Sequence, residues 1–194
     1  MCAAQVVKRG GLVVYPTETV YGLGCDPFNV EAVEHLLKVK GERCKPFPVL
    51  SASLTDVETA AFFNQNARLL AAKFWPGSLT LVLCKKPSFP DVVTFGLSSV
   101  GLRIPNNDVA LDLIRLSGGL LIGSSANRSG EEPPRAVHEI SDKLKGMVDV
   151  ILDGGPAVRG IPSTVADLTS DTPRILREGP ISQKAILDAL ALGD

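Results

Sequence analysis

Short apolar runs along the chain alternate with segments in which apolar residues recur every three or four positions. The first run, at residues 11–15, is rich in β-branched and aromatic side chains, as expected for a strand buried on both faces. Pro16 ends this strand because proline lacks the N–H that a sheet ladder needs. Further strands are predicted at residues 48–50, 78–83, 100–104, 120–123, 148–152, 164–168 and 174–176.

Segments with helical periodicity separate several of these strands. The first predicted helix begins after the N-cap Asn29, runs through Lys40 and stops at Gly41. Its apolar stripe, continued by one turn, reaches Lys40, so this lysine is expected at the edge of the buried face, whereas Lys38 points elsewhere. Further helices are predicted at residues 65–75, 108–116, 135–144 and 182–190, with another helix start at 53–56. The alternation indicates an α/β protein with a mixed sheet.

Composition indicates an ordinary globular protein. The 194 residues are 45% hydrophobic, and no repeat, low-complexity tract or long linker divides them, so a single domain over residues 1–194 is expected. The 20 lysines and arginines nearly balance the 21 aspartates and glutamates. No overall positive field therefore indicates nucleic acid or an anionic membrane as a partner, although a local basic patch would suffice for RNA.

Cysteine usage and the N-terminal sequence bear on metal sites and location. Cys2, Cys25, Cys44 and Cys84 are scattered, without the paired spacing of a zinc site or the density of a disulfide framework, so no metal site is expected. No signal-peptide pattern follows Met1, and no apolar run reaches the ~18 residues of a membrane span. A cytoplasmic protein without a membrane partner is expected.

Hydroxyl side chains crowd the segment YPTETVYGLG at residues 15–24, which follows the first strand. Pro16 turns the chain out of the sheet and presents Thr17, Thr19 and Tyr21 at the carboxyl end of the strand. Ligands bind at this end in open α/β sheets. These hydroxyls either form part of a substrate pocket or satisfy only the hydrogen bonds of their own turn.

Three cations, Lys40, Arg43 and Lys45, lie within six residues at the end of the first predicted helix. Arginine offers bidentate contacts to phosphate oxygens, and lysine offers a compact point charge. The segment is therefore a candidate clamp for a triphosphate. The alternative is that the cations only complement the dipole of the helix C-terminus.

A second hydroxyl-rich loop, GSSANRSG at residues 123–130, follows the apolar run 120–122. Its small residues allow a ligand to approach the backbone, and Ser125 and Asn127 add donors and acceptors suited to a phosphate or a ribose. The loop is neither a Walker A loop nor a GxGxxG motif, and the chain has no GxSxG elbow. The alternative is a polar connection that caps the next helix.

Two further cations and one hydroxyl extend this pattern. Arg103 lies inside the apolar strand 100–104, so it either faces solvent or pairs with an anion such as a substrate carboxylate. Ser163 precedes another predicted strand, and Arg177 follows the last one. Each arginine taken alone is explained equally by simple exposure to solvent.

Neither histidine has the surroundings of a general base. His35 and His138 lie on predicted helices without an acidic, serine or cysteine partner nearby, and no carboxylate pair has the spacing that glycoside chemistry needs. The hydroxyls and cations instead favour positioning of anions and neutralisation of charge at a phosphorus centre.

In order and spacing, these segments resemble the YrdC/Sua5 family, the threonylcarbamoyl-AMP synthases that begin the threonylcarbamoyladenosine modification of tRNA. The resemblance runs from about residue 11 to residue 179 and rests on residues 15–24, 40–46, 75–77, 103, 125–127, 163–165 and 177–179. It implies a twisted open mixed α/β sheet, flanked by helices, with a large concave cavity. The chain is similar to the short YrdC type rather than to the Sua5 type, which carries an extra C-terminal domain.

The resemblance also implies a reaction and its substrates. The amine of L-threonine joins bicarbonate or CO2 to give an N-carboxy intermediate. The carboxylate of this intermediate attacks the α-phosphorus of ATP, with Mg²⁺ as cofactor, to form threonylcarbamoyl-adenylate and pyrophosphate. A downstream tRNA-modifying transferase is the implied partner that takes the product.

Site residues are implied by similarity, position by position. Those implied at threonine are Thr17, Tyr21, Ser163 and Arg103, with Arg103 on the carboxylate. Those implied around the nucleotide are Lys40, Arg43, Lys45, Ser125, Asn127 and Arg177, with catalytic roles for Lys40, Arg43, Ser125 and Asn127. Catalysis then comes mainly from holding two anionic reactants together and stabilising the developing charge.

The cation segment departs from the family pattern, in which Lys-x-Arg is followed by a second lysine six residues after the first. Here Glu42 intervenes before Arg43, and Lys45 comes five residues after Lys40. Arg43 must therefore reach the phosphates from a different side.

Two other functions also fit a domain of this kind. Related domains look able to hold double-stranded RNA or tRNA in a positively charged concavity, so an RNA-binding module without synthase activity is one alternative, against which the net charge of −1 argues weakly. Carbamoyl transfer is the other, because YrdC-like domains occur in hydrogenase-maturation carbamoyltransferases. Those proteins carry acylphosphatase-like and zinc-finger segments, for which this chain has neither the length nor the CxxC pairs.

Overall fold

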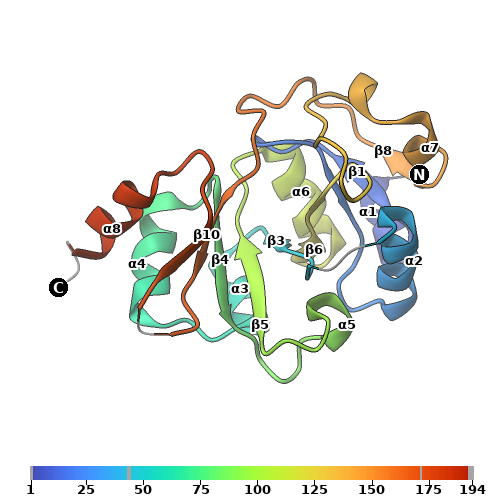
Figure 1. Ribbon diagram of the computed structural model, residues 1–194. Coiled ribbons are helices and arrows are strands. Elements are labelled where there is room, and N and C mark those ends of the chain that lie inside the picture. The colour runs from blue at the N-terminus through green and yellow to red at the C-terminus, as the bar shows by residue number, and fades with distance from the viewer. Residues whose placement is uncertain (1, 43–44, 171, 192–194) are drawn as a thin grey trace.

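The computed structural model describes residues 2–42, 45–170 and 172–191. Within these ranges the strands form two sheets (Figure 1). The smaller sheet lies beside the helices α1 (Ala3–Lys8) and α2 (Val30–Lys40), and the larger one runs through the centre of the molecule. Both sheets mix parallel and antiparallel pairs, which confirms the predicted α/β class with helices around mixed β-structure. One mixed sheet was predicted, whereas the structure divides the strands between two.

The smaller sheet has the strand order β7-β2-β1-β8. β1 pairs antiparallel with β2 and parallel with β8, and β2 pairs antiparallel with β7. Its strands are β1 (Val13–Tyr15), β2 (Gly22–Gly24), β7 (Ser124–Ser125) and β8 (Val150–Ile151). Because Gly22 lies opposite Ser125, this sheet brings the two hydroxyl-rich segments of the sequence side by side.

The larger sheet has the order β10-β9-β4-β5-β3-β6. Its pairs β9–β4 and β5–β3 are parallel, and the other pairs are antiparallel. Its strands are β3 (Val49–Ser51), β4 (Leu79–Cys84), β5 (Ser99–Arg103), β6 (Leu120–Ile122), β9 (Thr164–Asp167) and β10 (Arg174–Arg177).

The helices pack in pairs at the outside of the sheets: α1 against α6, α2 against α5 and α4 against α8 (Figure 1). Side-chain caps begin several of them. The Oδ1 atom of Asn29, for example, accepts the N–H of Ala32 at 3.0 Å and begins α2 as predicted. The remaining helices are α3 (Leu54–Ala60), α4 (Gln65–Phe74), α5 (Asp91–Thr94), α6 (Asp108–Ser117), the 3₁₀ turn η1 (Val137–Glu139), α7 (Asp142–Lys145) and α8 (Gln183–Ala191).

The strand β1 is buried on both faces, as the apolar run predicted. Val14 belongs to the main hydrophobic core, whereas Val13 and Tyr15 belong to a second core under α1 and α6. The neighbouring strand β2 was not predicted, because its Gly-Leu-Gly sequence is typical of a turn. Gly24 is required there by close packing, since a Cβ at this position would clash with the carbonyl oxygen of Ile122.

The central strands of the larger sheet separate core from cavity. In β5, Val100 and Leu102 enter the main core, while Ser99, Gly101 and Arg103 line a cavity on the opposite face. The same alternation occurs in β4 and β9, as expected from the two-residue period of a strand. The face of the sheet opposite the main core is therefore available for the polar side chains that line the cavity.

The predicted helix at residues 135–144 is wrong. The chain forms the short turn η1 and the short helix α7, and Ile140 between them has an extended backbone. The Oγ atom of Ser141 accepts the N–H of Leu144 at 3.4 Å, so this serine caps a new helix instead of continuing an old one. The short elements α1, α5 and β7 were also missed.

No helix among the described residues has both the length and the apolar content that crossing a bilayer requires.

Candidate active site

A cavity of about 630 Å³ is lined by residues of both sheets. Its floor is the polar face of β4, β5 and β9, and its walls are the turn after β1, residues 45–48, β7 and residues 162–163. The volume falls in the range of about 300–1,000 Å³ that is usual for small-molecule sites. The large cavity implied by the family resemblance is therefore present.

Arg103 is the most buried cation of this cavity, with 5% of its surface exposed. Its Nη2 atom lies 2.6 Å from a carboxylate oxygen of Glu18, which is also buried. Its Nε atom donates to the carbonyl of Gly77 at 2.9 Å, and Nη1 donates to the hydroxyl of Thr19 at 3.1 Å. Two segments of the chain, the turn with Glu18 and Thr19 and the one with Gly77, thus fix the guanidinium plane before any ligand arrives.

Glu18 lies behind this arginine and does not line the cavity. Its second carboxylate oxygen accepts the hydroxyl of Ser78 at 3.0 Å. Both oxygens of Glu18 therefore have hydrogen-bond donors, as buried polar atoms usually do. The sequence did indicate an anion for Arg103, but it did not indicate that the anion is part of the protein.

The hydroxyls of the turn after β1 serve the turn and also face the cavity. The Oγ1 atom of Thr17 accepts the N–H groups of Thr19 and Val20 and lies 2.9 Å from the hydroxyl of Thr19. Both threonines nevertheless line the cavity, and Thr19 also contacts Arg103. The two alternatives drawn from the sequence are therefore compatible.

Ser163 and Arg177 meet on the other side of the floor. The Nε and Nη2 atoms of Arg177 donate to the carbonyl of Ser163 at 3.0 and 2.7 Å, and Nη2 also lies 3.3 Å from its hydroxyl. The hydroxyl of Ser163 lies 2.8 Å from that of Thr80 on β4. All three side chains line the cavity.

Arg103, Arg177 and Lys45 outnumber the carboxylate of Asp167 among the charged side chains that line the cavity. Burial lowers the pKa of Arg103, and the ion pair with Glu18 opposes this effect. Partial burial also lowers the pKa of Arg177, and the nearby charge of Arg103 lowers it further. Arginine stays protonated in spite of such shifts, so the repulsion between the two cations favours an anion between them.

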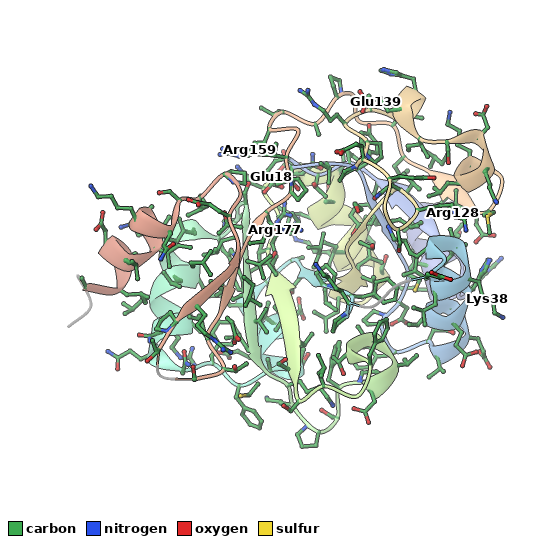
Figure 2. The ribbon with its side chains drawn as sticks, viewed as in Figure 1. Glu18, Lys38, Arg128, Glu139, Arg159 and Arg177 are labelled. Atoms are coloured by element: carbon green, nitrogen blue, oxygen red, sulfur yellow. The ribbon has the colours of Figure 1, made fainter. Side chains whose placement is uncertain are left out.

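Lys40 is buried more deeply than the edge position that the helical stripe predicted, with 2% of its surface exposed. Its Nζ atom donates to the carbonyl of Ser125 at 2.7 Å and to the carbonyl of Asn127. Lys40 does not line the cavity, whereas Ser125 does. In this structure the lysine holds the loop that carries Ser125. Lys38 lies on the outer side of α2 (Figure 2).

Asn127 also lies behind the cavity wall. Its Nδ2 atom donates to the carbonyls of Arg128 and Glu131 at 2.9 and 2.6 Å, which closes the loop on itself. Its Oδ1 atom is buried and has no hydrogen-bond partner among the described residues. Such an acceptor is costly to leave unpaired, so it marks a position where a donor is missing.

The hydroxyl of Tyr21 anchors the loop that follows β8. It lies 2.7 Å from the carbonyl of Gly155 and 3.2 Å from a carboxylate oxygen of Asp153, and it accepts the N–H of Gly154 at 3.2 Å. Burial raises the pKa of Tyr21, and the bond from Gly154 opposes the shift. The residue lines the cavity, while its hydroxyl is engaged with the loop.

Replacing Tyr21 with phenylalanine is expected to loosen this loop while the aromatic ring stays in place. The loss should be about 0.5–1.5 kcal/mol of stability, the usual contribution of a hydrogen bond. Hydrogen–deuterium exchange measured by mass spectrometry should rise in residues 153–160 and stay unchanged in β10. Unchanged exchange in the loop would show that the hydroxyl does not hold it.

The remaining predicted cations differ in position. Lys45 lines the cavity, and Arg43 lies outside the described residues. Among the described residues, no group of three or more histidine, cysteine, aspartate or glutamate side chains is arranged to hold a metal ion.

Sequence reasoning missed several residues of the site, among them Glu18, Thr80 and the cavity-lining Asp167. Glu18 looked like part of a turn, and its role depends on Arg103, 85 positions away. Thr80 lies within the predicted strand 78–83, and the strand pattern alone indicates no role for it in a site. Its signal is a single hydroxyl at the second position of the apolar run LTLVLC.

Fold and site together define an α/β protein whose cavity offers hydroxyls and guanidinium groups to anionic small molecules. Comparisons with known proteins extend this conclusion. The family model for Sua5, YciO and YrdC proteins, described as telomere recombination, matches residues 5–179. The chain therefore belongs to the Sua5/YciO/YrdC family, which confirms the resemblance drawn from the sequence motifs.

Individual relatives cover most of the chain. A threonylcarbamoyl-AMP synthase of Pyrococcus abyssi is 40% identical over 95% of the chain, and a putative threonylcarbamoyl-AMP synthase of Mycobacterium tuberculosis is 41% identical over 98%. The crystal structure of P. abyssi Sua5 with L-threonine superposes with a TM-score of 0.93 at 39% identity, over 97% of this chain and 56% of that one. The chain spans 55% of the P. abyssi relative's length and 88% of the M. tuberculosis relative's length.

Proposed function

We propose that the protein is an L-threonylcarbamoyladenylate synthase, which makes threonylcarbamoyl-AMP and pyrophosphate from L-threonine, bicarbonate or CO2, and ATP. The observation that carries this proposal is the pair of arginines, Arg103 and Arg177, on one cavity floor with hydroxyls around them. The names of the relatives and the threonine bound to P. abyssi Sua5 support it.

The reaction joins two anionic reactants, and the cavity is suited to hold both. The threonine amine attacks the carbon of bicarbonate, and water leaves, to give an N-carboxy threonine. Its carboxylate oxygen then attacks the α-phosphorus of ATP, and pyrophosphate leaves. Cations and oriented hydroxyls lower the barrier by reducing the repulsion between carboxylate and phosphate and by fixing their approach.

Each residue has a proposed place in this reaction. Arg103 binds the threonine carboxylate, with Thr17, Ser163 and the ring of Tyr21 beside it. Ser125, Lys45 and Arg177 face the nucleotide, and Arg43 joins them. Lys40 and Asn127 act one layer behind, by holding the loop of Ser125.

The further partners follow from the same chemistry. Mg²⁺ enters with ATP as part of the substrate, since it neutralises phosphate charge in most phosphoryl-transfer reactions. The product is a mixed anhydride, which hydrolyses readily in water. A tRNA-modifying transferase that accepts it directly, in the cytoplasm, is therefore the proposed downstream partner.

Pyrophosphate release tests the proposal. The purified protein with MgATP should release pyrophosphate only when both L-threonine and bicarbonate are present, and release should fall to background when either is omitted. Equal release without threonine would contradict the synthase activity. Salt-dependent binding of RNA without any pyrophosphate release would instead favour an RNA-binding module.

A further inference from the structure

The floor of the cavity contains a buried pair of hydroxyls from two neighbouring strands. Thr80 lies on β4 and Ser163 immediately precedes β9, and their oxygens are 2.8 Å apart. Only 4% of Thr80 and 5% of Ser163 is exposed, and both side chains line the cavity. Ser163 already has a proposed role at threonine, whereas Thr80 has none.

One of the two hydroxyl hydrogens in this pair is not used in the hydrogen bond between Thr80 and Ser163. Two hydroxyls carry two hydrogens, and the bond between their oxygens uses one of them. The remaining contact of the pair is the one from Nη2 of Arg177 to the Ser163 oxygen, in which the serine accepts. Whichever hydroxyl donates to the other, one hydrogen lacks an acceptor in the described part of the chain. Because both side chains line the cavity, a ligand bound there is an acceptor that this hydrogen can reach.

The surroundings of Thr80 select an anionic ligand. The β4–β5 register pairs Leu81 with Leu102, so it places Thr80 level with Arg103 on the cavity face. On the other side, Thr80 pairs with Val165 of β9, next to the strand end that carries Ser163. The spare hydrogen thus lies between Arg103 and Arg177, two of the three cationic side chains among the described residues that line the cavity.

Gly101 is the diagonal neighbour of Thr80 on β5 and leaves room for the Thr80 side chain. A Cβ on Gly101 would lie 3.3 Å from the methyl carbon of Thr80, which is tighter than ordinary contact. The backbone of Gly101 has no left-handed φ that would require glycine. Close packing against Thr80 is therefore the physical reason for glycine at this position, and both residues line the cavity floor.

We propose that Thr80 is a substrate-contacting residue, whose hydroxyl pair with Ser163 donates a hydrogen bond to a carboxylate or carbonate oxygen. The inference rests on the proposed function and adds a residue to it. The oxygen belongs either to the amino acid or to the one-carbon substrate, and the two sources are separable by experiment.

The test compares Thr80→Val, which removes the hydroxyl at nearly constant volume, with Thr80→Ser, which keeps it. Thr94→Val is the matched control, because Thr94 is also buried but does not line the cavity. Calorimetry with L-threonine alone measures the affinity for the amino acid. The KM for bicarbonate in pyrophosphate release reports on the interaction with the one-carbon substrate. A hydrogen bond to an anion corresponds to a loss of about 10- to 100-fold in one of these quantities.

Each outcome decides the proposal. A weaker calorimetric affinity in Thr80→Val assigns the oxygen to threonine, and a raised KM for bicarbonate with unchanged threonine binding assigns it to the one-carbon substrate. Both support the role if Thr80→Ser behaves like the wild type. The proposal is overturned if Thr80→Val changes neither the affinity for L-threonine nor the KM for bicarbonate. It is also overturned if Thr80→Ser shows the same loss as Thr80→Val. If the wild type releases no pyrophosphate but binds L-threonine in a Thr80-dependent way, the proposed function fails and the contact stands.

Discussion

Replacing Arg103 with methionine is expected to reduce kcat/KM for L-threonine in pyrophosphate release by about 10- to 100-fold, because the charged hydrogen-bond donor to the substrate carboxylate is lost. The same variant should lose about 3–5 kcal/mol of unfolding free energy. This loss arises because Glu18 would be left as an uncompensated charge in the protein interior. Steady-state kinetics and urea denaturation measure the two effects separately.

A second variant distinguishes the loss of activity in Arg103→Met from its loss of stability. The double change Arg103→Met with Glu18→Gln removes both charges, so stability should recover largely or completely. Activity should stay low, because the group that binds the substrate carboxylate is still missing. If the double variant regained turnover together with stability, Arg103 would have only a structural role. Arg68→Met, which breaks the exposed pair with Glu58, serves as the control and should change little.

Replacing Lys40 with methionine is expected to have the second largest effect. The variant keeps an unbranched side chain of similar length but loses the Nζ donor to the carbonyls of Ser125 and Asn127. Hydrogen bonds from a charged group contribute about 1.5–3 kcal/mol each, so stability should fall measurably. The KM for ATP should rise as well, because the loop that carries Ser125 loses its anchor. Denaturation curves and ATP titrations measure both changes.

Lys38→Met is the matched control for this experiment. Lys38 lies on the same helix but is exposed, so its replacement should affect neither stability nor the KM for ATP. A Lys40→Met variant with wild-type stability and no ATP binding would contradict the anchoring role and would indicate direct contact between this lysine and the phosphates.

Much of the fold was predictable because local signals agreed with tertiary structure. The strand β1 and the helix α2 follow from an apolar run, a capping asparagine and a terminating glycine, all of which act within a few residues. The error at residues 135–144 has a local cause too, since Ser141 could either continue a helix or cap a new one. The strand β2 depends on a distant contact instead, the close approach of Gly24 to Ile122, which no local pattern indicates.

The site was predictable as a set of segments but not as a set of contacts. Thr17, Arg103 and Ser163 do meet in one cavity. The partner of Arg103 could not be predicted, because Glu18 reaches it only after two sheets come together. Lys40 was expected near phosphate, yet the rotation of α2 places its amine under the loop of Ser125.

The identity of the nucleotide product tests the central claim most directly. The protein is incubated with MgATP, L-threonine and bicarbonate labelled with carbon-13, and the nucleotide product is analysed at once by mass spectrometry. The account predicts an AMP conjugate that contains threonine and one labelled carbon. An AMP conjugate of threonine without the label, or pyrophosphate release without any conjugate, would contradict it.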